Sequence, residues 1–285
     1  MRLPRPFLRP RVRRVAGAGV VAVLLVAAVA GGPAGVASAE PRWAAAGTAA
    51  VHPGVATHTA GGQCTSNFVF TRGSAVLLGQ AAHCAGTGGA TETDGCDSHS
   101  RPLGTRVRIE GAQHRGTLVY SSWRAMQASG ESNANTCAYN DLALVRVHRA
   151  DRGKVNPSVP FWGGPTGVAR GGTATGDAVF SYGNSSLRLG LAPLSPKTGT
   201  SLGDTGGGWS HDVLTASPGV PGDSGSAFLA ANGKALGTLS TLALAPLPGS
   251  NGVGNLAKEM AYARSHGMSG LKLVRGTQPF TRLLP

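Results

Sequence analysis

Charged and aromatic side chains are scarce in this sequence of 285 residues. Asp, Glu, Lys and Arg together make up 14% of it, and Phe, Trp and Tyr only 5%, whereas charged residues are about 25% of an ordinary soluble domain. This scarcity argues against long helices with charged faces. Glycine is abundant, at 44 residues, and this balance favours many short strands joined by glycine and proline turns.

The sequence also lacks the spacings that are typical of metal sites. No two cysteines are separated by just two residues, and the pattern His-Glu-x-x-His does not occur, so we expect no metal and no other cofactor. The four cysteines are Cys64, Cys84, Cys96 and Cys137. If the chain is exported to an oxidising compartment, we expect them to be bridged rather than free.

No run of basic residues with interleaved aromatics is present after the N-terminal segment, although the formal net charge is +13. Residues 1–39 contain six arginines and no acid, and the remainder keeps 20 basic and 13 acidic residues, a net charge of +7. These remaining charges are scattered along the chain. We therefore expect a soluble basic surface and no nucleic-acid binding.

No apolar run reaches the ~20 residues that a membrane-spanning helix needs. The longest covers residues 15–30, and small residues follow at positions 37–39 (Ala-Ser-Ala). This pattern predicts a signal peptide over residues 1–39 that is removed after export. The pair Arg13-Arg14 leaves the choice between general and twin-arginine export open. We expect a secreted, extracellular monomer that has no membrane contact once the signal is removed.

The rest of the chain divides into two strand-rich halves. Residues 40–60, rich in Ala, Thr and Gly, have the composition of a leader or a short pro-segment, and we expect a folded domain over residues 61–285. A Gly/Pro-rich connector at residues 151–176 separates a first half at about 61–155 from a second at about 165–254.

Hydrophobic periodicity locates the individual elements. Apolar residues at helical spacing predict one helix at about 255–266. Period-2 alternation and short apolar runs predict strands at residues 67–71, 74–79, 106–110, 113–120, 142–147, 178–182, 187–191, 226–229 and 235–242.

Three short motifs carry chemistry. Residues 81–84 read Ala-Ala-His-Cys at the end of an apolar strand, residues 140–145 read Asn-Asp-Leu-Ala-Leu-Val, and residues 221–226 read Pro-Gly-Asp-Ser-Gly-Ser. Each motif alone has an ordinary explanation as a strand end or a turn. Together they give the order His, Asp, Ser in an exported chain rich in strands, which is far more specific.

The three motifs resemble those of the chymotrypsin/trypsin family of serine peptidases, and the resemblance covers roughly residues 61–256. The short lead-in from residues 63–65 (Gln-Cys-Thr) to the histidine is most similar to the bacterial secreted branch, that of the streptogrisins and alpha-lytic-type peptidases. This resemblance implies an all-β fold of two six-stranded antiparallel β-barrels with a C-terminal helix. His83 and Asp141 would come from the first barrel and Ser224 from the second.

The resemblance also implies a mechanism that hydrolyses protein or peptide substrates. His83 would take the proton of Ser224 as it attacks the peptide carbonyl, and Asp141 would orient the imidazole and stabilise its charged form. The backbone N–H groups of Gly222 and Ser224 would form the oxyanion hole, which needs the tight turn that glycine allows.

Two further expectations concern covalent and ionic links. The resemblance supports a disulfide between Cys64 and Cys84, which leaves Cys96 and Cys137 as the second pair, although four cysteines allow three pairings. Animal members pair the acid beside the nucleophile with a freed Ile or Val N-terminus. Residues 57–62 (Thr-His-Thr-Ala-Gly-Gly) offer no such site, so we expect an internal donor for Asp223.

The primary specificity pocket is predicted from two positions. Members that cleave after Lys or Arg carry an acid six residues before the nucleophile, and Pro218 stands there. If Ser240 is the strand serine that lies beside the substrate, Leu242 narrows the pocket and small or medium apolar residues are preferred. Ser240 is equally interpretable as an ordinary strand residue. An insertion that brings Asp204 or Asp212 to the pocket is the alternative.

Two rival functions can be weighed against peptidase activity. An esterase of the α/β-hydrolase type requires the order Ser, Asp, His and the pattern Gly-x-Ser-x-Gly, and the sequence has neither. A catalytically inactive protein of the chymotrypsin fold, used for binding or adhesion, is the remaining alternative. The presence of all three triad side chains argues against it.

Overall fold

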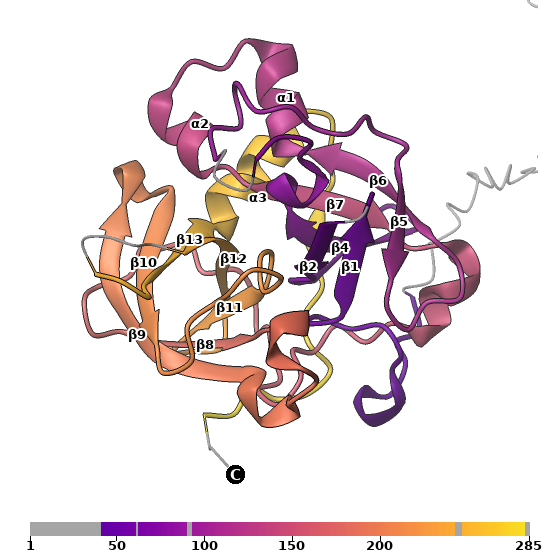
Figure 1. The fold of residues 1–285 in the computed structure, drawn as a ribbon. Helices are drawn as coiled ribbons and strands as arrows, with labels where there is room; N and C mark the ends of the chain where they lie inside the picture. The colour runs from indigo at the N-terminus through magenta and orange to yellow at the C-terminus, as the bar shows by residue number, and fades with distance from the viewer. Residues whose placement is uncertain (1–40, 61, 90–92, 243–246, 283–285) are drawn as a thin grey trace, which may run out of the picture. The chain divides into compact units, whose positions relative to one another are not determined.

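The computed structural model describes residues 41–60, 62–89, 93–242 and 247–282. The predicted signal peptide therefore lies outside the described residues. Within the described ranges, no helix is both long and apolar enough to span a bilayer. These described residues form mainly antiparallel strands, arranged in two sheets, together with three short α-helices (Figure 1).

The first sheet has eight antiparallel strands in the order β14-β3-β4-β7-β6-β5-β1-β2. The sequence predicted a six-stranded barrel here. Six strands form the middle of the sheet, while β2 extends one edge and β14, from the C-terminal tail, extends the other by pairing with β3. The strands are β1 (Ala56–Thr59), β2 (Gly62–Thr65), β3 (Val69–Arg72), β4 (Ala75–Ala81), β5 (Arg106–Ile109), β6 (Gly116–Ser121), β7 (Leu142–Arg146) and β14 (Lys272–Leu273).

The second sheet is a closed six-stranded barrel in the order β10-β13-β12-β11-β8-β9, as predicted. Val179, Val213, Phe228 and Leu239 belong to the buried apolar cluster of this barrel. Its strands are β8 (Ala178–Tyr182), β9 (Pro196–Thr205), β10 (Ser210–Thr215), β11 (Ala227–Ala230), β12 (Ala235–Leu242) and β13 (Asn251–Asn255).

The predicted C-terminal helix is present as α3 (Leu256–Ser265). The Asn255 side chain caps its first turn by accepting the Lys258 N–H at 3.2 Å, which satisfies one of the free donors at a helix start. The sequence did not predict α1 (Ser122–Ser129) or α2 (Ala134–Tyr139). The remaining helical turns are η1 (Ala46–Thr48), η2 (Ala82–Ala85), η3 (Arg149–Lys154), η4 (Ser186–Arg188), η5 (Ala192–Leu194) and η6 (Gly206–Gly208).

A shared apolar core joins the two sheets. Phe68 and Leu142 from the first half, Trp162 from the connector, Leu229 from the second half and Leu256 from α3 belong to one buried cluster. Burial of this kind contributes about 25 cal/mol per Å² of apolar surface. The cluster therefore fixes the first sheet against the barrel, and with them the two sets of residues that the motifs contribute.

Candidate active site

His83 and Asp141 are brought together by the pairing of β4 with β7. Ala81, the last residue of β4, lies opposite Leu142, the first residue of β7. His83 follows on η2 and Asp141 directly precedes β7. The backbone N–H of His83 donates to Asp141 Oδ1 at 2.9 Å, and His83 Nδ1 lies 2.7 Å from Asp141 Oδ2. One carboxylate thus holds both the backbone and the ring of the histidine.

The carboxylate of Asp141 also accepts a hydrogen bond from a residue of the six-stranded barrel. Ser240 lies at an irregularity in the pairing of β12 with β13, and its hydroxyl donates to Asp141 Oδ2 at 2.6 Å. The Asp141 side chain is only 5% exposed and the His83 side chain 26%. Burial lowers the pKa of His83, but the charge of Asp141 and its hydrogen bond outweigh burial and hold that pKa above its ordinary value.

Ser224 occupies a tight turn that leads into β11. Asp223 donates its N–H to Val220 O at 2.8 Å, and the Ser226 N–H donates to Asp223 O at 3.0 Å. Gly222 and Gly225 have φ of +95° and +89°, a region that favours glycine. A Cβ at Gly225 would also lie 2.4 Å from the carbonyl oxygen of Thr65. The turn therefore needs glycine on both sides of Ser224.

The turn directs its carbonyl and N–H groups to different partners. Thr65 donates its N–H to Ser224 O and its hydroxyl to Gly222 O, both at 2.8 Å. In the described part of the chain, the N–H groups of Gly222 and Ser224 donate to no protein acceptor. Two backbone donors next to the Ser224 hydroxyl are therefore available to a ligand.

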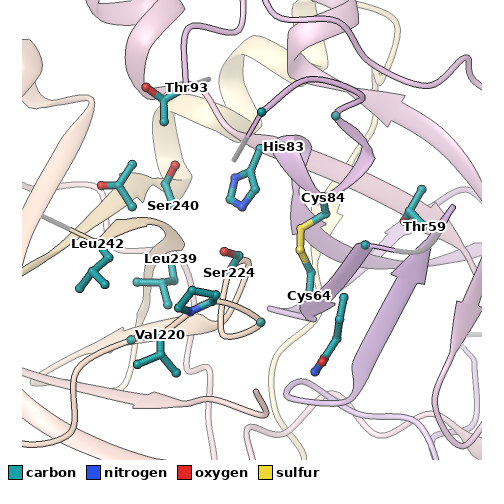
Figure 2. A pocket seen from close by; sticks show the side chains of 18 of the residues that line it. Thr59, Cys64, His83, Cys84, Thr93, Val220, Ser224, Leu239, Ser240 and Leu242 are labelled. Atoms are coloured by element: carbon teal, nitrogen blue, oxygen red, sulfur yellow. A yellow bond between two sulfur atoms is a disulfide. The ribbon is translucent and has the colours of Figure 1, made fainter. Parts of the chain in front are cut away.

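The side chains of His83, Ser224 and Ser240 line one cavity of about 560 Å³. Figure 2 shows the His83 ring directed toward Ser224 across this space. Both halves of the chain contribute walls. Those from the first half include Thr59, Cys64, Cys84 and Trp123, and those from the second include Gly219, Val220, Gly222, Leu239, Leu242 and Asn251.

Two disulfides brace the first-half wall. Cys64 on β2 is bonded to Cys84, the residue after His83, and Cys96 is bonded to Cys137 on α2. These are the two pairs that the sequence favoured. The first links the histidine segment to the strand that leads into Thr65, which itself holds the nucleophile turn.

Asp223, next to Ser224, is fully buried and paired with two cations. Its Oδ2 lies 2.6 Å from an Arg188 guanidinium nitrogen and 3.1 Å from Lys197 Nζ, and its Oδ1 accepts the Ser185 N–H at 3.0 Å. Burial raises the pKa of Asp223, but the Arg188 hydrogen bond and the two positive charges outweigh it and lower that pKa. An internal donor was expected, but Arg188 and Lys197 were not identified from the sequence.

The cavity lining includes two of the three residues that the sequence suggested for the specificity pocket, Ser240 and Leu242, but not Pro218. Pro218 does not line the cavity; its carbonyl accepts from Arg188 at 2.8 Å and Lys197 at 3.3 Å, while its neighbour Gly219 lines the space. Leu242 lines the cavity as expected, and so does Asn251, which the sequence analysis missed.

The alternative acids are also placed elsewhere. Neither Asp204 nor Asp212 lines the cavity. Asp204 Oδ1 lies 2.7 Å from Nδ1 of the buried His211, and Asp212 accepts from Thr205 at 3.4 Å. Both acids lie on the β9–β10 pair of the barrel.

Comparison with known proteins identifies the architecture. No family model and no curated protein sequence matches the chain. Among solved structures, Thermobifida fusca Protease A matches with a TM-score of 0.50 and 18% identity, over 79% of this chain and 99% of that one. The chain has the chymotrypsin-like fold.

Other bacterial peptidases match the same region. Nocardiopsis protease NAPase gives a TM-score of 0.47 with 18% identity, covering 78% of this chain and 98% of that one. Cellulomonas bogoriensis chymotrypsin gives 0.46 with 18% identity, covering 79% and 98%. The fold assignment rests on the likeness to Thermobifida fusca Protease A, and the chemistry must be argued from the side chains of the cavity.

Proposed function

We propose that this protein is a serine endopeptidase that hydrolyses peptide bonds through an acyl-enzyme, with His83, Asp141 and Ser224 as its catalytic triad. The observation that carries the proposal is the hydrogen bonding of Asp141 to both the backbone and the ring of His83, in a cavity shared with Ser224. Bacterial peptidases of the same fold support the same class of reaction.

The proposed reaction follows from this arrangement. The Ser224 hydroxyl attacks the substrate carbonyl while His83 accepts its proton, and Asp141 stabilises the imidazolium that forms. The carbonyl oxygen becomes an oxyanion, to which the free N–H groups of Gly222 and Ser224 donate. His83 then gives the proton to the leaving amine, and water hydrolyses the resulting ester of Ser224 by the same steps in reverse.

The acid beside the nucleophile supports activity without an N-terminal switch. Asp223 is already neutralised by Arg188 and Lys197, so no newly freed amino group is needed to satisfy it. We therefore propose that the protein is secreted after loss of residues 1–39 and that the form beginning at Glu40 is active. The two disulfides are typical of such an oxidising destination.

We further propose that cleavage follows small or medium apolar residues. Among the described lining residues there is no carboxylate to receive Lys or Arg, and an unpaired buried cation costs several kcal/mol. Asn251 crosses between the two pocket walls: it accepts the Gly219 N–H at 2.8 Å and donates to Thr241 O at 3.1 Å. We infer that this bridge, together with Leu242 on the cavity wall, disfavours a large ring.

The substrate preference is tested with peptides that differ only in the residue before the cut. Wild type should favour Ala, Val or Leu over Phe and Lys in kcat/KM. Replacing the bridge by Asn251→Gly should raise the Phe/Ala ratio by about 10-fold or more, within the range that pocket shape controls. A wild-type preference for Lys or Arg, or an unchanged ratio in the variant, would contradict this assignment of the pocket.

Labelling with a fluorophosphonate tests the triad directly. The folded protein should be labelled at Ser224, and Ser224→Ala and His83→Ala should abolish both labelling and peptide hydrolysis. Ser269→Ala, at an exposed serine outside the cavity, serves as the serine control and should keep both labelling and activity. Wild type that is folded but neither labelled nor active would identify the protein as an inactive, binding member of the fold.

A further inference from the structure

A second carboxyl group lies directly behind the proposed triad. Glu259 is in the first turn of α3 and is 0% exposed. Its Oε1 accepts the backbone N–H of Asp141 at 3.2 Å, and its Oε2 accepts the Thr238 hydroxyl at 3.0 Å. The side chain thus reaches the residue that orients His83 without lining the substrate cavity.

Glu259 lies where three parts of the fold meet. Thr238 belongs to β12 of the barrel, and its hydroxyl also accepts from Asn67 of the first half at 3.3 Å. Asp141 directly precedes β7 of the first sheet, and α3 packs against β7, β12 and β13. A Cβ on Gly254 of β13 would lie 2.5 Å from Glu259 Oε1. The space is therefore closed around the carboxyl group.

The groups that face Glu259 supply no positive charge. From the start of β7 comes Asp141, from β6 the hydroxyl of Tyr120, and from β12 the uncharged Thr238. Among the described residues, no Lys, Arg or His forms an ion pair with it. Burial, with a contribution from the charge of Asp141, raises the pKa of Glu259 to about 8.

We propose that Glu259 is a positioning residue: its uncharged carboxyl group holds the backbone of Asp141 in place, and ionisation of Glu259 disturbs the triad. In the neutral form it keeps a hydrogen-bond acceptor on the Asp141 backbone while Asp141 remains the only negative charge facing His83. Ionisation places a second, unpaired negative charge in a closed space beside the first. The inference rests on the proposed triad, because it assigns an effect to the alignment of Asp141.

The test compares Glu259→Gln and Glu259→Ala with wild type in kcat and KM from pH 5 to pH 10. Gln keeps an acceptor and cannot ionise. We expect the kcat of this variant to stay within about threefold of wild type at pH 7, with the same acid midpoint. The kcat of wild type should fall above pH 8, and the Gln variant should not show this fall. Ala removes the acceptor, and we expect kcat at pH 7 to fall about 10-fold with little change in KM.

Glu131→Gln is the matched control, because Glu131 is a half-buried carboxyl outside the cavity that also accepts backbone N–H groups. It should follow wild type at every pH. If Glu259→Gln lowers the acid midpoint of His83, Glu259 is already ionised at neutral pH and the proposal is wrong. The proposal also fails if both Glu259 variants match wild type throughout the pH range.

A failure of the proposed function gives a different result. In that case no form is labelled by fluorophosphonate at any pH, and the kinetic comparison with wild type cannot show activity at all. The proposal about Glu259 would then fall with the triad on which it rests. Labelling of wild type at Ser224, with indistinguishable pH profiles for the variants, would instead refute the role of Glu259 alone.

Discussion

Asp223 and Glu259 are both fully buried carboxyl groups next to the proposed triad, yet their pKa values shift in opposite directions. Asp223 lies beside Ser224 and has Arg188 and Lys197 within 3.1 Å, and its pKa is lowered. Glu259 lies behind Asp141, its donors among the described residues are the neutral Asp141 N–H and Thr238 hydroxyl, and its pKa is raised to about 8. Burial raises the pKa in both cases, so the cations decide the difference.

A buried carboxyl group can therefore stabilise the proposed site in two ways, as a charged group with cation partners or as an uncharged group with neutral partners. The ion cluster of Asp223 fixes the turn that presents Ser224 and keeps its charge over the whole physiological range. The carboxyl group of Glu259 satisfies hydrogen bonds without adding charge beside Asp141. The first arrangement should therefore be sensitive to loss of a charged partner, and the second to pH.

The largest effect is expected from Asp223→Asn. It leaves Lys197, whose side chain is 0% exposed, and Arg188, whose side chain is 9% exposed, without a negative partner. Breaking a buried ion pair from one side costs about 3–5 kcal/mol, so the free energy of unfolding in urea should fall by that order. Asp97→Asn, at an exposed position, is the surface control and should change it by about 0.5 kcal/mol or less.

A second substitution sharpens this result. Adding Lys197→Met to Asp223→Asn removes one unpaired cation and should recover part of the lost stability. If the single variant unfolds at the wild-type urea concentration, the ion cluster does not stabilise the turn and the comparison with Glu259 loses its basis.

A smaller, pH-dependent effect is expected from Glu259→Gln. Because the folded pKa of about 8 lies above the unfolded value of 4.5, the folded state of wild type binds more protons between these pH values, and its stability falls as pH rises through that window. Gln lacks this loss. Its stability relative to wild type should therefore grow by roughly 3 kcal/mol between pH 5 and pH 8.

This measurement uses urea unfolding in the Ser224→Ala background, which prevents any self-cleavage. The relative stability of the Gln variant should stop changing above about pH 8, where the wild-type carboxyl is ionised in both states. Parallel stability curves for the two proteins across pH 5–8 would show that Glu259 has no raised pKa in the folded protein.

The sequence predicted the parts of this arrangement that are written in local patterns. Three short motifs pointed to His83, Asp141 and Ser224, and period-2 alternation located most strands of both sheets. The partners of the buried acids have no such pattern. Arg188 is 35 residues from Asp223, and Glu259 is 118 residues from Asp141. Their roles depend on tertiary packing, which single-sequence periodicity does not report.

The predicted strand at residues 187–191 shows how tertiary contacts override a local pattern. Its alternation of Leu with other residues suggested a half-buried strand, but the structure has η4 and turns there, with Leu187 and Leu189 64% and 84% exposed. Arg188 between them is directed inward to Asp223. The next strand of the barrel after β8 is β9, which begins at Pro196. Its many Thr, Gly and Ser residues give no clear apolar alternation.

The smallest effect concerns the hydrogen bonds of the Asp141 carboxylate. This carboxylate is stabilised by the neutral Ser240 hydroxyl at 2.6 Å and by His83. In Ser240→Ala the carboxylate loses one donor, so it should interact more strongly with the imidazolium and raise the pKa of His83 further. Because the pKa of His83 is held above its ordinary value of about 6.5, we expect the acid midpoint of kcat/KM in wild type to lie above that value. In Ser240→Ala it should rise further, by less than about one pH unit. Thr71→Ala, a half-buried strand residue outside the cavity, should leave it unchanged. A midpoint that falls in Ser240→Ala would mean that Asp141 depends on Ser240 for its position more than for its charge.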